Sequence, residues 1–326
     1  MKDEGELMSF ASETRNELAH LHGDRKCCML AEIAGFIRVC GSIGLVGGGK
    51  FKIVTVTENP AVARHFKMLL KQYFNIEATL EVGEGNTLKK GKYYIITIGP
   101  EELSELILRE TGILMIREGM NFISDGIYQG LVRKKCCKKA YLRGLFLGAG
   151  TCSNPEKGYH FEIVCATETL ANDVKKLLNS FVDIHAKKTQ RKKEYVVYIK
   201  ESEQIVDILA IMGASNQIFK YEDVRIRKGI RGQANRLNNC DQANIDKTIM
   251  AAEKHINNIR IIEEKMGLEK LPEKLKVVAE LRLQHPDVSL VELGQMLDPP
   301  LKKSGINKRL IKIGEIASKL QSGEEI

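Results

Sequence analysis

One segment of this chain occurs twice, as RKCCMLAEIAGFIRVCGS at residues 25–42 and as KKCCKKAYLRGLFLGAGT at residues 134–151. The alignment pairs Cys27 and Cys28 with Cys136 and Cys137, Gly35 with Gly144, and Gly41 with Gly150. Farther along, residues 56–80 align with residues 166–189. Self-similarity of this kind predicts that the same structural unit is built twice.

Both copies show the same succession of expected elements. An apolar helix that ends at glycine is followed by strands with β-branched and aromatic residues, an amphipathic helix, two further strands and a closing helix. In the two copies, the first helix is expected at residues 30–39 and 140–147, and the strand before the amphipathic helix at residues 51–57 and 159–167. The amphipathic helix is expected at residues 60–73 and 170–181, and the closing helix at residues 101–111 and 202–212. The order αββαββα, repeated at about residues 22–113 and 131–215, predicts an α+β fold whose sheet is covered on one face.

The motifs IAGFIRVCG (residues 33–41) and LRGLFLGAG (residues 142–150) each open one of these units, and the pair resembles the signature of the LAGLIDADG homing endonucleases. The resemblance implies that the two signature helices pack against each other at a pseudo-twofold axis, where Gly35 and Gly144 let the backbones approach. It also implies that the next-to-last position of each motif holds an acid that binds the catalytic metal. Those positions here are Cys40 and Ala149.

This exchange removes the expected chemistry. Mg²⁺ prefers carboxylate oxygens, which neither a thiol nor a methyl group supplies. Glu32 precedes Cys40 by about two helical turns, which is too far to replace the missing acid. We therefore expect no catalytic residue, no metal and no other cofactor, and a chain that is not an enzyme. A metal-dependent endonuclease that uses an unrecognised acid and an RNA-binding protein of the maturase type are the alternatives.

The expected sheet also differs from that of the nucleases, which is thought to lie over the DNA duplex. The segments at residues 92–99 and 194–200 carry apolar residues on both faces, which argues against DNA contact through the face of the sheet. The segment AKKTQRKK contains no acid and is expected at a hairpin tip. Its basic residues are candidates for auxiliary DNA contacts: Lys187, Lys188, Arg191, Lys192 and Lys193.

Composition sets further bounds. The 326 residues carry a formal net charge of +8, which favours an acidic partner such as nucleic acid. The sequence lacks a leader pattern and a run of about 18 apolar residues, which predicts a cytoplasmic, nucleoid-associated protein. Eight cysteines in such a protein are expected to be reduced thiols. The two adjacent cysteine pairs lack the spacer of a zinc knuckle, so we expect buried thiols rather than ligands.

Beyond residue 220 the repeat ends and the composition changes. Residues 221–240 are polar, basic and contain glycine, as is typical of a linker, and residues 241–326 are expected to form a helical domain. After a helix at residues 245–266, three shorter helices form an expected helix-turn-helix at about residues 272–318. Ser289 and Glu292 form a capping box before the second of them, and Ser304 is expected to cap the third.

The third helix carries the candidate DNA-reading face. Ile306, Leu310, Ile313 and Ala317 form its apolar stripe, and the opposite face is basic. Its candidate DNA-binding residues are Lys302, Lys303, Ser304, Asn307, Lys308, Arg309 and Lys312. Asn and Arg suit base edges in a major groove, whereas lysines and the serine hydroxyl suit phosphates.

A LAGLIDADG-like domain at residues 1–220 followed by a helix-turn-helix closely resembles the WhiA family of bacterial regulators. The resemblance implies binding to specific sequences of double-stranded DNA. It also implies transcriptional regulation linked to sporulation, cell division or chromosome segregation, and it is compatible with a protein partner. It implies neither binding to a membrane nor a small-molecule substrate.

Overall fold

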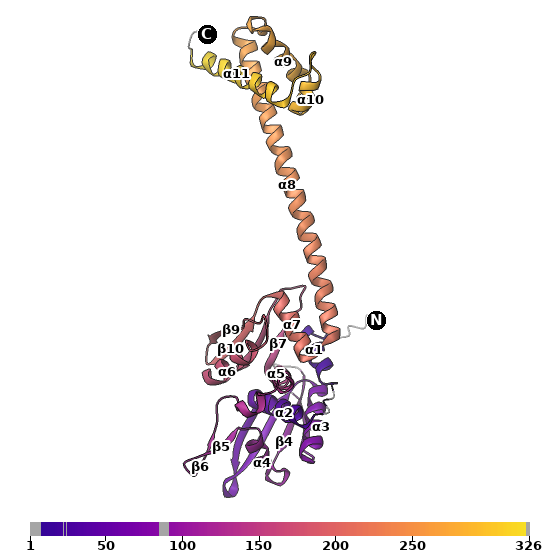
Figure 1. The fold of residues 1–326 in the computed structure, drawn as a ribbon, viewed down its shortest axis with the longest axis vertical. Helices are drawn as coiled ribbons and strands as arrows, with labels where there is room; N and C mark the ends of the chain where they lie inside the picture. Colours follow the sequence, from indigo (N-terminus) through magenta and orange to yellow (C-terminus); the bar gives the residue numbers. More distant parts are fainter. Residues whose placement is uncertain (1–7, 22, 24, 85–90, 324–326) are drawn as a thin grey trace. The chain divides into compact units, whose positions relative to one another are not determined.

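The computed structural model describes residues 8–21, 23, 25–84 and 91–323 (Figure 1). The chain divides into two compact units, Met1–Lys228 and Gly229–Ile326, hereafter unit 1 and unit 2. Unit 1 contains both copies of the repeat, and unit 2 contains the expected helix-turn-helix.

Two paired helices form the centre of unit 1 (Figure 1). They are α2 (Lys26–Cys40) and α5 (Lys135–Ala149), which include the two signature motifs. A Cβ atom on Gly35 would collide with the carbonyl oxygen of Tyr141, and one on Gly144 with the carbonyl oxygen of Glu32. Glycine is therefore needed at both positions, as the sequence predicted, because the backbones of α2 and α5 touch there.

Each copy of the repeat contributes one antiparallel sheet of four strands. The first consists of β1 (Gly41–Val46), β2 (Lys50–Thr57), β4 (Lys92–Ile98) and β3 (Thr79–Glu84), in that order. The second consists of β7 (Gly150–Cys152), β8 (Phe161–Cys165), β10 (Glu194–Ile199) and β9 (Lys187–Arg191). The strand orders are equivalent, which confirms the predicted duplication and α+β class.

Helices cover one face of each sheet. They are α3 (Pro60–Phe74) and α4 (Ser104–Glu110) in the first copy and α6 (Glu168–Leu178) in the second, where α7 (Ser202–Met212) packs against α5. The side chains of Asn59 and Thr167 cap α3 and α6 by accepting backbone N–H bonds. Strand residues alternate between this buried face and an open face, so Ile53 and Ile163 are fully buried whereas Val54 and Val164 are partly exposed.

Two features of unit 1 are absent from the predicted succession of elements. One is a small hairpin of β5 (Leu114–Arg117) and β6 (Met120–Ile123) between the two copies of the repeat. The other is α1 (Phe10–Leu18), which packs against α3 and α5. The sequence does not predict α1, because its short apolar stripe, with Phe10 and Leu18 buried, is hard to recognise without its packing partners.

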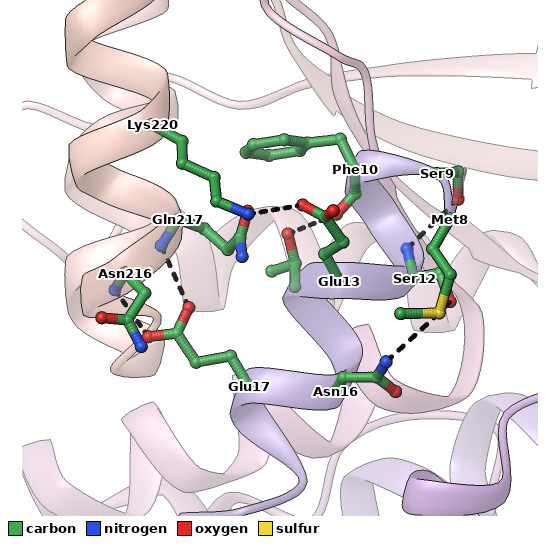
Figure 2. A network of polar contacts seen from close by, with 11 residues as sticks. Met8, Ser9, Phe10, Ser12, Glu13, Asn16, Glu17, Asn216, Gln217 and Lys220 are labelled. Carbon is green, nitrogen blue, oxygen red and sulfur yellow. Dashed lines mark hydrogen bonds and ion pairs between the residues drawn. The ribbon is translucent and has the colours of Figure 1, made fainter. Parts of the chain in front are cut away.

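Helix α1 anchors the first turn of α8 (Ser215–Lys265) within unit 1, as Figure 2 shows. The carboxylate of Glu17 accepts the backbone N–H groups of Asn216 and Gln217, at 2.6 and 3.0 Å. The ammonium of Lys220 lies 3.0 Å from the carboxylate of Glu13. Glu17 thus acts as an N-cap supplied by another helix, because it satisfies donors that have no partner inside α8.

Residues 221–240, the predicted linker, include the boundary between the two units, and α8 runs through them without interruption. The segment contains no proline, and its two glycines each cost about 1 kcal/mol relative to alanine, which a long helix tolerates. Tyr221 and Val224 are buried in unit 1, whereas residues 233–251 are exposed. The polar composition that suggested a linker belongs to an exposed helix.

Unit 2 contains the end of α8, then α9 (Glu273–Gln284), α10 (Leu290–Gln295) and α11 (Lys303–Ser322). Its core joins side chains from all four helices, among them Ile259, Val278, Leu293 and Leu310. The capping box of Ser289 and Glu292 is confirmed. Ser304 is not the cap of α11, because it lies inside the helix. The helix begins at Lys303, and its N-cap is Lys302.

Candidate nucleic-acid interface

The turn between α10 and α11 is held closely against α10. The backbone N–H of Leu301 donates to the carbonyl oxygen of Gly294 at 2.8 Å. A Cβ atom on Gly294 would collide with the carbonyl oxygen of Leu301, so the turn and the helix pack backbone against backbone. This contact fixes the start of α11 relative to α10, as a helix-turn-helix requires.

The preceding turn, between α9 and α10, depends on a buried arginine that the sequence analysis missed. Arg282 is 2% exposed, and its guanidinium donates to the carbonyl oxygens of His285, Pro286 and Val288, the last at 2.7 Å. Burial lowers the pKa of Arg282, partly opposed by Asp287. The neighbouring Leu283, although apolar, is only half-buried.

The two faces of α11 are sharply different. All four residues of the predicted apolar stripe are buried, which confirms the orientation of the helix. Six of the seven candidate DNA-binding residues are exposed: Lys302, Lys303, Ser304, Asn307, Lys308 and Lys312. Arg309 is half-buried and lies on the same helix between Lys308 and the buried Leu310.

The cations of this face have no acidic partner among the residues that the structure describes. Within the described part of the chain, neither the four lysines nor Arg309 forms an ion pair or a side-chain hydrogen bond. The N-terminus of α11 also has no side-chain cap. The positive pole of the helix and the basic side chains therefore coincide, which suits a phosphate backbone.

The second basic cluster, at residues 187–193, lies on the β9–β10 hairpin as predicted. Two of its members are engaged with acids from other elements: Lys188 lies 2.6 Å from Glu168 of α6, and Arg191 lies 3.1 Å from Glu162 of β8. Lys187, Lys192 and Lys193 are exposed, and the described residues offer them no ion-pair partner. The cluster contains no acid in its own sequence, but acids from α6 and β8 pair with two of its five cations. Three cations therefore remain available to bind a ligand.

The open faces of the two sheets are mainly neutral. The register places Val54, Val56, Ile95 and Thr97 together on the first sheet. On the second sheet, Val164 and Tyr198 are partly exposed beside the ion pair of Glu162 and Arg191, whereas Val196 is buried. These surfaces lack the dense positive charge with which proteins cover a duplex.

The positions of the lost acids lie at the C-terminal ends of the central helices. Cys40 ends α2 and Ala149 ends α5. Burial raises the pKa of Cys40, and its thiol donates to the carbonyl oxygen of Phe36 at 3.1 Å. In the described ranges, no set of three or more His, Cys, Asp or Glu ligand atoms gathers at these two positions.

Glu32 is engaged inside unit 1. Its carboxylate lies 2.7 Å from Nε2 of His65 on α3 and is bound by the guanidinium of Arg143 on α5. Burial alone would raise the pKa of Glu32, but the hydrogen bonds to His65 and Arg143 outweigh it and lower the pKa below the usual value of 4.5. Glu32, which is 2% exposed, therefore links the two copies of the repeat as a buried anion.

The fold brings the two cysteine pairs together. Cys27 and Cys28 lie in the first turn of α2, and Cys136 and Cys137 in the first turn of α5. The four Sγ atoms all lie within 4.8 Å of one another. The prediction that all four are simply buried is wrong, since Cys27 is exposed and Cys136 is partly so.

No helix in the described ranges is both long and apolar enough to cross a bilayer.

Comparisons with known proteins cover nearly the whole chain. Three family models match: the WhiA N-terminal LAGLIDADG-like domain at residues 26–114, the WhiA LAGLIDADG-like domain at 138–231 and the WhiA C-terminal HTH domain at 234–317. Relatives named probable cell division protein WhiA include one from Thermoanaerobacter pseudethanolicus, 46% identical over 96% of this chain and 98% of its own length. Another, from Alkaliphilus metalliredigens, is 43% identical over 96% of this chain and 98% of its own length. The crystal structure of full-length WhiA from Thermotoga maritima is 26% identical, with a TM-score of 0.56 over 96% of this chain and 99% of that one.

Proposed function

Since the chain belongs to the WhiA family, we propose that it binds specific sequences of double-stranded DNA and regulates transcription, and that the helix-turn-helix of unit 2 reads the DNA. The printed name of its relatives, probable cell division protein WhiA, supports a role for the regulated genes in cell division. Our proposal extends this role to chromosome segregation or sporulation, as the resemblance in sequence implies. Such a protein acts on the nucleoid, in the cytoplasm.

The observation that carries this proposal is the free basic face of α11. Cations that are exposed and unpaired bring little stability to unit 2 itself, but each can displace counterions from a phosphate backbone. A buried apolar stripe on the opposite side holds the helix firmly. A rigid helix with a positive start is the element that a helix-turn-helix inserts into the major groove.

Within this face the side chains divide by chemistry. Asn307 can form a bidentate pair with adenine and Arg309 with guanine, which makes them the candidates for base recognition. Lys302, Lys303, Lys308, Lys312 and the hydroxyl of Ser304 are the candidates for phosphate contacts, which set register without reading sequence. The half-buried stem of Arg309 restricts its rotamers and favours a directed contact.

Unit 1 takes an auxiliary part in this proposal, without catalysis. The central positions Cys40 and Ala149 supply no carboxylate, and the open sheet faces are mainly neutral. Lys187, Lys192 and Lys193 can add phosphate contacts from the β9–β10 hairpin. The sheet faces, with exposed apolar residues such as Val56, alternatively suit a protein partner.

The proposal is tested by selecting duplexes from a random DNA pool with the full-length chain, then measuring affinity for the selected and scrambled duplexes over a salt series. We expect a preference of about 10³-fold or more and a steep fall of affinity with salt. The same incubation with Mg²⁺ or Mn²⁺ should leave the DNA intact. Equal affinity for all duplexes, preference for structured RNA, or cleavage abolished by a chelator would each refute the proposal.

A further inference from the structure

The four cysteines at the start of α2 and α5 form a cluster that DNA binding does not explain. They come from two equivalent positions of the repeat, which the pseudo-twofold packing of the central helices brings face to face. Because the backbones of these helices touch at Gly35 and Gly144, the separation of their first turns is fixed by packing. Cys27, Cys28, Cys136 and Cys137 are hereafter called the thiol cluster.

We propose that the thiol cluster is a structural site for one Zn²⁺ ion, bound by all four sulfur atoms, that ties the two copies of the repeat together. Zn²⁺ takes four thiolates in tetrahedral geometry at about 2.3 Å, which separates neighbouring sulfurs by about 3.8 Å. Sγ of Cys136 and Sγ of Cys137 lie 3.9 Å apart, and no pair in the cluster exceeds 4.8 Å. Small side-chain rotations therefore suffice to close the site.

The spacing also selects among metals that prefer sulfur. In a four-iron cluster each cysteine binds a different iron, so the sulfurs must stand farther apart than around a single ion. The sulfur atoms here surround one point, which favours a mononuclear ion of tetrahedral preference. The thiols are also not paired as disulfides, since all eight cysteines of the chain are free in the structure.

Electrostatics at the cluster favours thiolates bound to a cation. Both helices lack a side-chain N-cap, so their positive poles face the sulfurs. Binding of a divalent cation by four thiolates releases their protons to solvent.

The position of the cluster indicates what the ion does. Cys137 is 5% exposed while Cys27 is exposed, so zinc can enter from solvent and its sulfurs are afterwards shielded on one side. All four ligand positions are filled by protein, which leaves no open site for catalysis. A closed site between α2 and α5 stabilises their pairing at one end of the axis.

Metal content is the first test. The full-length chain, purified with a reductant and without chelator, should contain about one zinc per chain, with sulfur neighbours at about 2.3 Å by X-ray absorption. The variant Cys27→Ser with Cys136→Ser should retain less than about one tenth of this zinc. The matched control is Cys240→Ser, which removes an exposed cysteine of α8 and should keep the full content.

Two further measurements keep the test decisive if the double variant does not fold. Cobalt added to the metal-free wild-type chain should give the charge-transfer absorption of thiolate-bound Co²⁺, which zinc then removes. A strong chelator should lower the midpoint of thermal unfolding of the wild type by about 5 to 10 °C. A reduced chain that binds neither zinc nor cobalt would overturn the proposal. Iron with acid-labile sulfide, or disulfides between the pairs in freshly isolated protein, would overturn it equally.

Discussion

The central helices of unit 1 and the last helix of unit 2 differ in what they do with their charges. In unit 1 the anion of Glu32 is enclosed by His65 and Arg143, and the positions from which a nuclease would hold its metal carry a thiol and a methyl group. At α11 the lysines are exposed and Arg309 is half-buried, and none of these cations is paired within the described residues. Charges that neutralise one another inside a core hold a fold together, whereas charges without a partner are available to a ligand.

The largest expected effect breaks the enclosed charge of unit 1. Glu32→Gln leaves the guanidinium of Arg143, whose side chain is only 13% exposed, without its anion, so the free energy of unfolding should fall by about 3 to 5 kcal/mol. Chemical denaturation followed by circular dichroism measures it. The exposed Glu81 of β3 offers a matched control, because Glu81→Gln should change stability by no more than about 0.5 kcal/mol. Equal stability of the two variants would show that the buried ion pair does not hold unit 1 together.

Acid should remove the same contribution. The pKa of Glu32 is lowered in the folded state, so its ion pairs stabilise the fold fully above the unfolded value of about 4.5. Their contribution is lost as pH falls through the folded pKa, where the protonated carboxyl group becomes as neutral as glutamine. The stability difference between wild type and Glu32→Gln, measured from pH 7 downward, should therefore be constant to about pH 4.5 and then shrink. A difference that grows on acidification contradicts the assigned direction.

Much of this contrast could be predicted from sequence because its signals are local or repeated. Gly35 and Gly144 align in the repeat, and the stripe of Ile306, Leu310 and Ile313 shows the periodicity of one helix. The capping box joins Ser289 and Glu292, which are only three positions apart. Each of these features is set by a few neighbouring positions, which a single sequence displays directly.

The remaining features depend on contacts between residues far apart in the chain. Glu17 caps α8 from about two hundred residues away, and Glu168 and Glu162 neutralise part of a cluster that contains no acid of its own. The helical path of residues 221–240 was hidden by a composition that exposed helices share with linkers. The convergence of the thiol cluster was implied by the repeat, but only the close packing of α2 and α5 reveals its spacing.

Smaller effects are expected on the free cations of unit 2. Arg309→Ala should reduce the preference for the selected duplex over scrambled DNA by about 1 to 3 kcal/mol, because it removes a bidentate contact to a base. Fluorescence anisotropy with both duplexes at one salt concentration measures the preference. An equal loss on the two duplexes would assign Arg309 to the phosphate backbone instead.

Lys303→Ala should have the smallest effect and a different signature. It is expected to weaken binding to selected and scrambled duplexes alike, and to reduce the slope of log K against log salt concentration by about 1. The exposed Lys319, in the last turns of α11, provides the comparison, since Lys319→Ala should leave the slope unchanged. A slope unaffected by Lys303→Ala would place the phosphate contact elsewhere.

The contrast between the two regions is tested most directly by mapping the DNA sites bound across the genome by three full-length chains. They are the wild type, the variant Lys308→Ala with Arg309→Ala on α11, and the variant Lys192→Ala with Lys193→Ala on the β9–β10 hairpin. We expect the α11 variant to lose its sites and the hairpin variant to keep the wild-type sites with reduced occupancy. Sites that persist in the α11 variant and vanish in the hairpin variant would contradict the account, because the duplex would then be read by unit 1.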